Sequence, residues 1–317
     1  MENDDNEPTQ EEVTELAKLA QRFNNAIFQK PINEEEIGFI LTNTSNDERQ
    51  VIKACYEKMF GVTIESDIKD TLSSKLKDLC IVMFDAPYEY DAKEIYRGLH
   101  SFVSDDNVIC EIIASRPKWM LDLINEAYNK FYKITLIDDI KKKKTGKYKL
   151  FLLACLTNER RKENLLSNEE AKKIVNKMKE KNPKNWSNDV ELFTEYFVKP
   201  SRDDLIKIAR IYKELNNMDL YDTVNKFCSG TCRKLMKAVL YSTITPSEWY
   251  AKRAHRAVEG LGTDTVTLNR VVVGRAEIDM DYIRDYYHME RNVDLYDDII
   301  GDTSGAYAKI LSDLVGH

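Results

Sequence analysis

A sequence pattern that occurs four times constrains the fold of this chain more than any other feature. Four tyrosines mark it, and they are 72, 84 and 75 residues apart: Tyr56, Tyr128, Tyr212 and Tyr287. An apolar residue follows each tyrosine after eight residues and again after twelve, and a small residue follows after eighteen. These positions are Ile64, Leu136, Leu220 and Leu295, then Ile68, Ile140, Val224 and Ile299, then Ser74, Gly146, Gly230 and Gly305. Self-similarity over such a period is the sequence signature of a repeat architecture.

The apolar residues around each tyrosine recur at helical spacing. In the last copy Ile278, Tyr282, Ile283, Tyr286 and Tyr287 are predicted to share one helical face. A unit of this length holds four or five short helices, and each helix needs its neighbours to cover its apolar stripe. The predicted organisation is an acidic N-terminal segment, residues 1–12, followed by repeats at 13–86, 87–158, 168–245 and 246–316.

Composition supports a soluble helical protein. Only 11 Gly and 7 Pro among 317 residues argue against a disordered chain or an all-β protein with many turns. The net charge of −7 argues against nucleic acid as a partner. The longest apolar runs, such as Leu150–Leu153, are far shorter than the ~20 residues that cross a bilayer, and the N-terminus lacks a signal pattern. Six scattered cysteines indicate buried thiols in a reducing compartment, so we expect a cytoplasmic protein.

Two glycine-containing segments distinguish the fourth copy. Gly260–Asp264 reads GLGTD, and Gly301–Gly305 reads GDTSG, with Asp302 standing 40 residues beyond Gly262. Together with Val273–Asp279, these segments closely resemble the fourth repeat of the annexins. The resemblance is weaker, but aligned, over the other three copies. It implies an all-α fold of four repeats with about five helices each, packed as a compact, curved disc.

The same resemblance implies a Ca²⁺ site in the fourth repeat. Three main-chain carbonyls, those of Val258, Gly260 and Gly262, and the carboxylate of Asp302 would bind the ion. Glycines suit such a loop because positive φ costs them little, and Ca²⁺ prefers oxygen ligands. A lipid phosphate would complete the shell while Leu261 dips into the membrane interface. With a single carboxylate, the expected affinity without lipid is on the order of 10⁻⁴–10⁻³ M.

An alternative reading of the same residues stays open at this point. Asp302 can serve as a helix N-cap assisted by Thr303 and Ser304, with no metal at all. The sequence also departs from the family at Glu259, where a basic residue usually precedes the first glycine. That acid either weakens docking on an anionic surface or lends the ion another carboxylate. Glu277 is a second, weaker candidate ligand for an accessory ion.

The other three copies have lost this site. Fifteen residues after the tyrosine, where the fourth copy has Asp302, they have Thr71, Lys143 and Phe227. Their loops are altered as well, at Gln29–Ile32, Ser101–Ser104 and Asn185–Asn188. The sequence therefore predicts one ordinary Ca²⁺ site in the whole chain.

Two of the altered copies carry candidate membrane contacts that need no calcium. In the second copy, Lys141, Lys142, Lys143 and Lys144 place fixed cations where the metal would be, and each lysine near an anionic leaflet contributes about 1 kcal/mol. They can equally be a solvated helix face. In the third copy, Trp186 stands at the loop tip, where an indole suits the membrane interface. It can equally pack against its own repeat.

The sequence offers no catalytic constellation, since none of the four histidines has a nucleophile motif beside it. The leading function is reversible, Ca²⁺-dependent binding to anionic phospholipid by a protein peripheral to the membrane. The alternative is a scaffolding protein that uses the annexin fold on a cytoskeletal partner, as the resemblance to divergent protist annexins such as the alpha-giardins implies. A third reading is a calcium-insensitive lipid binder that works through the lysines.

Overall fold

The chain is all-α, as expected. The structure is a computed structural model, and it describes residues 9–102, 104–163 and 166–316. Over these residues it has twenty α-helices, one 3₁₀ turn and one π-helical turn, and no strand. The α-helices are α1 Gln10–Phe28, α2 Glu34–Thr42, α3 Asn46–Phe60, α4 Ile64–Thr71, α5 Ser74–Phe84, α6 Pro87–His100, α7 Asp106–Ser115, α8 Lys118–Tyr132, α9 Leu136–Lys143, α10 Gly146–Thr157, α11 Asn168–Glu180, α12 Val190–Phe193, α13 Arg202–Asn216, α14 Leu220–Phe227, α15 Gly230–Ile244, α16 Pro246–Val258, α17 Thr265–Arg275, α18 Met280–Arg291, α19 Leu295–Asp302 and α20 Gly305–Val315.

The fourfold sequence pattern has a structural cause. Each anchor tyrosine is buried in the third helix of a group of five, and the residue eight positions later is the buried first residue of the fourth helix. The residue eighteen positions later begins the fifth helix with a positive φ, between 55° and 65° in the four copies. Glycine adopts that conformation without strain, which explains Gly146, Gly230 and Gly305. The repeat limits given above stay a prediction.

Three of the tyrosines also tie the third helix to the fourth through a hydrogen bond. The Tyr56 hydroxyl donates to Asp67 at 2.6 Å, and the same bond recurs from Tyr128 to Asp139 and from Tyr287 to Asp298. In each pair the aspartate stands eleven residues after the tyrosine. Burial and the neighbouring carboxylate raise the pKa of Tyr287, so its hydroxyl stays a donor at neutral pH.

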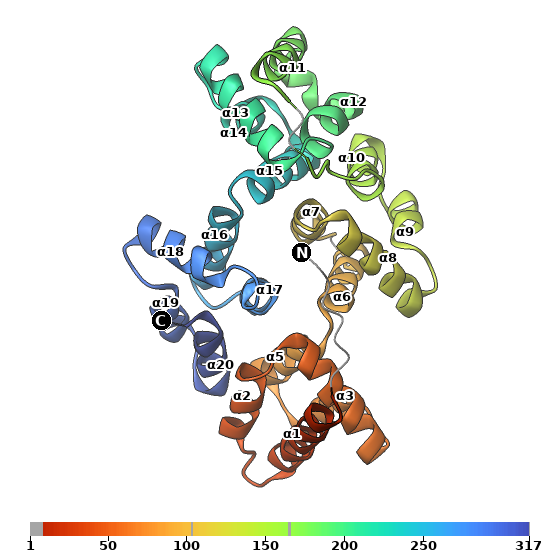
Figure 1. The fold of residues 1–317 in the computed structure, drawn as a ribbon, viewed down its shortest axis with the longest axis vertical. Helices are drawn as coiled ribbons and strands as arrows, with labels where there is room; N and C mark the ends of the chain where they lie inside the picture. Colours follow the sequence, from red (N-terminus) through yellow and green to blue (C-terminus); the bar gives the residue numbers. More distant parts are fainter. Residues whose placement is uncertain (1–8, 103, 164–165, 317) are drawn as a thin grey trace. The chain divides into compact units, whose positions relative to one another are not determined.

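The helices form two compact units. One unit holds the described residues up to Pro87 together with those from Tyr250 onward, and the other holds Tyr88–Trp249. In the first unit α2 packs on α20, and α5 packs on both α17 and α20, so segments from the two ends of the chain share one core (Figure 1). In the second unit α7 packs on α15 and α11 packs on α13. None of the described helices combines the length and the apolar content that crossing a bilayer requires.

One predicted helical face is partly wrong. Ile283 and Tyr287 are buried in α18, but Ile278 and Tyr282 are exposed. Ile278 precedes the helix, which begins at Met280, and the buried stripe follows the spacing Met280, Ile283, Tyr287. The predicted face therefore failed in two ways: Ile278 lies before the helix, and Tyr282 lies within it but on the exposed face.

Candidate metal site

The loop between α16 and α17 is held open by two glycines. Gly260 has φ +111° and Gly262 has φ +87°, and a Cβ added at either position would meet nothing within 4 Å. Glycine is therefore required by the backbone conformation and not by crowding. The loop closes where the Asp264 N–H donates to the Ala257 carbonyl at 2.8 Å, and the Asp264 side chain caps α17 through the Thr267 N–H at 3.0 Å.

Five successive carbonyls of this segment have no hydrogen-bond donor. Over the described parts of the chain, the main-chain oxygens of residues 258–262 accept no hydrogen bond. A loop that binds a cation through its main chain must leave carbonyls available in this way. Those of Val258, Gly260 and Gly262, the three ligands that the sequence predicts, are among them.

Asp302 contributes the second half of the site. It is the last residue of α19, and its Oδ2 atom is buried without a hydrogen-bond partner. The Thr263 hydroxyl donates to the Asp302 carbonyl at 3.1 Å, which joins the glycine loop to the end of α19. An unpaired buried carboxylate oxygen costs free energy unless a cation or a donor compensates it.

These atoms fit Ca²⁺ better than other metals. The available donors are carbonyl and carboxylate oxygens, which suit a hard cation, and no thiolate or imidazole takes part. Within the described ranges no group of three or more His, Cys, Asp or Glu side chains is placed to hold a metal. A metal bound here would therefore depend on main-chain carbonyls. The N-cap reading of Asp302 is wrong, because Asp302 lies inside α19 and α20 begins after Ser304.

Lys75 is a neighbour of this site that the sequence did not indicate. Its Nζ atom donates to the Thr263 hydroxyl at 3.2 Å and lies 5.7 Å from the centre of the Tyr307 ring. The lysine comes from α5, so only the packing of α5 on α17 brings it to the loop. It places a positive charge beside the atoms proposed to bind a cation.

Replacing Lys75 by methionine is expected to tighten calcium binding by about two- to fivefold, because it removes a positive charge that contacts the proposed calcium loop at Thr263. The measurement is the calcium concentration that gives half-maximal binding to anionic vesicles. Lys69→Met, which removes an exposed lysine from α4, is the matched control and should leave this concentration unchanged. Unchanged or weaker binding in Lys75→Met would show that Lys75 does not act on the site.

The loop tip and its unusual acid are both at the surface. Leu261 is fully exposed, as a residue that enters a membrane interface must be. Glu259 is exposed too, and its Oε2 atom lies 3.4 Å from Nε2 of His255 on α16. The carboxylate is thus turned toward its own helix.

Glu277 has a role other than the predicted one. Its carboxylate accepts from the Arg49 guanidinium at 2.8 Å and from the Asn46 N–H at 3.0 Å, at the start of α3. The Arg49 side chain is buried; burial lowers its pKa, and Glu277 opposes that shift. Glu277 therefore joins the fourth repeat to the first as an ion pair, and its part as a ligand of an accessory ion stays a prediction.

In the second repeat the structure uses a different lysine from the predicted one. Lys144, not Lys143, reaches the loop before α7: its buried Nζ atom contacts the Ser104 hydroxyl and lies 2.6 Å from Oδ1 of Asp106. The buried Lys144 ammonium thus joins the end of α9 to the loop before α7. In the fourth repeat the hydrogen bond from Thr263 to Asp302 joins the corresponding segments. Lys141, Lys142 and Lys143 stay exposed on α9, so the predicted membrane contact is wrong for Lys144 and stays a prediction for the other three.

Replacing Lys144 by methionine is expected to destabilise the protein by about 2–3 kcal/mol. Breaking a fully buried pair costs about 3–5 kcal/mol, and the loss is smaller here because Asp106 stays partly in water. Chemical unfolding followed by circular dichroism measures it. Lys143→Met removes an exposed charge from the same helix and should change the free energy of unfolding by less than about 0.5 kcal/mol. Equal effects of the two substitutions would contradict the assigned role of Lys144.

The prediction that Trp186 touches a membrane is wrong. The side chain is 0% exposed, and its Nε1–H donates to the Lys181 carbonyl at 3.2 Å. The ring packs edge-on against Phe197 and Tyr212, with centroids 6.2 and 6.0 Å away. The segment Pro183–Asn188 is a 3₁₀ turn instead of an open loop, and this turn carries the indole into the core.

Phe102 is an exposed residue that the sequence reasoning missed. It stands three residues before the N-cap Asp105, as Leu261 stands three residues before the N-cap Asp264, and it is fully exposed. Phe102 therefore occupies in the second repeat the loop-tip position that Leu261 occupies in the fourth. Aligning the two loops in the sequence on Asp105 and Asp264 would have indicated an exposed apolar residue at Phe102.

Comparison with known proteins agrees with these features. The family profile described as Annexin matches residues 18–83, 90–155 and 250–314. Annexin A3 of Mus musculus is 30% identical over 299 residues, which cover 94% of this chain and 92% of the relative. Annexin A5 of Homo sapiens is 31% identical over 285 residues, covering 90% and 89%.

Solved structures show the same fold. The annexin III structure superposes with a TM-score of 0.90 at 28% identity and covers 95% of this chain and 94% of its own. The calcium-bound structure of alpha-14 giardin has a TM-score of 0.80 at 16% identity and covers 95% and 100%, which supports the fold alone. The profile, the relatives and the repeat fold together show that this chain belongs to the annexin family.

Proposed function

We propose that this protein binds anionic phospholipid membranes in a calcium-dependent and reversible manner, through one Ca²⁺ site in its fourth repeat. Annexins are generally non-enzymatic, calcium-dependent phospholipid-binding proteins. The observation that carries the proposal is the buried Oδ2 atom of Asp302, which has no hydrogen-bond partner among the described residues, beside a loop whose carbonyls at 258–262 accept no hydrogen bond from them. On this proposal the protein is cytoplasmic and peripheral to the membrane.

The ion is proposed to join protein and lipid. The carbonyls of Val258, Gly260 and Gly262 and the carboxylate of Asp302 would hold it on the protein side. Ca²⁺ takes six to eight oxygen ligands, so sites remain for water and for a lipid phosphate oxygen. Lipid then raises the apparent affinity for calcium by ordinary linkage, because it binds only the complete site.

The second repeat is proposed to contact anionic membranes as well, without a metal. Phe102 is exposed at its loop tip, and Lys141, Lys142 and Lys143 are exposed on α9. Lys144 replaces the ion by closing the loops with its own ammonium group. Such a contact adds attraction to anionic lipid that falls as salt rises.

Co-sedimentation with vesicles tests the proposal. The protein should pellet with vesicles that contain phosphatidylserine when calcium is present, and should stay in the supernatant with chelator or with neutral vesicles. Pelleting that ignores chelator and falls with salt would favour the calcium-insensitive lysine contact instead. No pelleting at millimolar calcium would contradict membrane binding and favour a scaffold that binds a cytoskeletal protein.

A further inference from the structure

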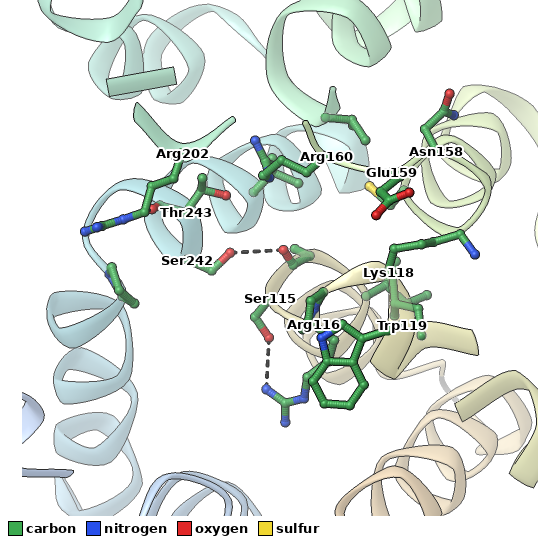
Figure 2. Close-up of a pocket in the computed structure, with 18 of the residues that line it drawn as sticks. Ser115, Arg116, Lys118, Trp119, Asn158, Glu159, Arg160, Arg202, Ser242 and Thr243 are labelled. Atoms are coloured by element: carbon green, nitrogen blue, oxygen red, sulfur yellow. Dashed lines mark hydrogen bonds between the residues drawn. The ribbon is translucent and has the colours of Figure 1, made fainter. Parts of the chain in front are cut away.

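The second unit contains a cavity that the membrane function does not use. Its volume is about 460 Å³, within the size range of sites for small organic ligands. Its wall comes from four parts of the chain: the α7–α8 turn, the segment after α10, the start of α13 and the end of α15 (Figure 2). All of these belong to the unit Tyr88–Trp249.

The wall of this cavity is strongly basic. Five cationic side chains line it together with a single acid, Glu159: Arg116, Lys118, Arg160, Lys162 and Arg202. Three of the cations are paired with acids: Arg116 forms a bidentate pair with Asp91, Lys118 pairs with Asp122, and Lys162 lies 3.9 Å from Glu159 of the same wall. The excess of positive charge in the cavity therefore comes from Arg160 and Arg202.

Arg160 is the most constrained of these cations. Its guanidinium donates to the Pro200 carbonyl at 2.6 Å and to the Phe197 carbonyl at 3.0 Å, and over the described residues no carboxylate lies within ion-pair distance of it. Burial lowers its pKa to about 10, which still leaves it charged at neutral pH. Arg160 is half-buried, and a guanidinium partly removed from water without a counter-anion is energetically unfavourable, so a bound anion would relieve that cost.

The mouth of the cavity adds a second guanidinium and an aromatic surface. Arg202 is exposed, and over the described residues its guanidinium donates hydrogen bonds to the carbonyls of Thr243 at 3.0 Å and Ile244 at 3.3 Å. Trp119 is 61% exposed, which is unusual for so large an apolar side chain. Figure 2 shows Trp119 at the start of α8 beside Arg116 and Lys118, with Arg160 and Arg202 on other segments of the wall. The cavity thus brings guanidinium groups and an exposed indole together.

We propose that this cavity binds a small phosphorylated molecule that carries a flat ring, with its phosphate at Arg160 and Arg202 and its ring against Trp119. The planar fork of arginine matches phosphate oxygens, and an exposed indole is a stacking surface for a ring. The cavity is larger than a phosphate ion needs, and its apolar wall, including Val239 and Leu121, suits the organic part.

The position of the cavity favours a soluble ligand over a membrane lipid. The cavity lies at the C-terminal end of α7, and the loop that carries Phe102 lies before its N-terminal end. Ten helical residues separate these two ends by about 15 Å. The preference for a soluble ligand is the one part of this inference that rests on the proposed membrane function. When Phe102 contacts a membrane, the cavity lies at the opposite end of α7.

Calorimetric titration of the full chain with three probes tests the proposal, in chelator and without vesicles. Adenosine triphosphate supplies phosphate and ring, tripolyphosphate supplies charge alone, and adenosine supplies the ring alone. The triphosphate should bind at least tenfold more tightly than either of the others. Equal binding of tripolyphosphate would overturn the ring contact, and no binding of any probe at millimolar concentration would overturn the site. Neither result bears on calcium or membranes.

Three substitutions locate the binding. Arg202→Gln and Trp119→Ala change exposed side chains and should each weaken triphosphate binding at least fivefold with an unchanged melting temperature. Arg160→Gln should weaken it more, but its carbonyl contacts also support the fold, so the other two variants decide the outcome if it is unstable. Lys172→Gln removes an exposed lysine from α11 and is the charge-matched control. Wild-type affinity in both Arg202→Gln and Trp119→Ala would contradict the proposed site.

Discussion

Asp302→Asn is expected to abolish calcium-dependent binding to anionic vesicles at calcium concentrations that saturate the wild type. The substitution keeps the shape of the side chain and removes its charge, which is the only carboxylate charge proposed for the site. An amide oxygen is a weaker ligand for a hard cation, so half-maximal binding should need at least about thirtyfold more calcium. Vesicle co-sedimentation across a calcium series measures this shift.

The same substitution separates binding from stability. Because Oδ2 of Asp302 has no hydrogen-bond partner among the described residues, removing its charge breaks no contact there, and the midpoint of chemical unfolding without calcium should stay the same or rise. Asp281→Asn, an exposed acid on α18 in the same repeat, is the matched control and should bind vesicles like the wild type. Full calcium-dependent binding by Asp302→Asn, or equal losses in both variants, would refute the assigned role.

Trp186→Ala should cause the largest loss of stability of any substitution considered for this chain. The indole is fully buried between Phe197 and Tyr212, and truncating a buried tryptophan costs about 3–5 kcal/mol. That is a large part of the 5–15 kcal/mol that is typical of folded domains. Denaturant unfolding followed by circular dichroism measures the change.

Trp119→Ala provides the control for that prediction. Trp119 is the same residue type but is mostly exposed, so its removal should cost less than about 1 kcal/mol. A small effect of Trp186→Ala would mean that the third repeat exposes its indole after all. In that case Trp186 would become a candidate membrane contact again.

The fold and the backbone conformation of the glycine loop were predictable because their determinants are local. The buried tyrosine, the apolar residue that begins the fourth helix and the positive-φ residue that begins the fifth each depend on nearby positions in the chain. The sequence Gly260–Asp264 likewise determines its own backbone conformation. Because each helix group needs the same three residues, these residues recur in the sequence at the same spacing and reveal the repeat.

Some of the missed contacts join residues that are far apart in the sequence. Others depend on which of two neighbouring residues faces the protein interior. Glu277 meets Arg49 across 228 residues, and Lys75 meets Thr263 across 188, so neither contact has a sequence signature. Lys143 and Lys144 are neighbours in a run of four lysines, and only the end of α9 decides which one turns inward. Trp186 was misplaced because a 3₁₀ turn replaces the open loop in the third repeat.

A crystal structure determined in millimolar calcium tests the central claim most directly. The account predicts one ion in the fourth repeat, about 2.3–2.6 Å from the carbonyl oxygens of Val258, Gly260 and Gly262 and from the Asp302 carboxylate. It also predicts no ion at the second-repeat loop, where Lys144 already supplies a cation. An empty fourth-repeat loop at saturating calcium, or an ion bound in the second repeat in place of the Lys144 ammonium, would contradict it.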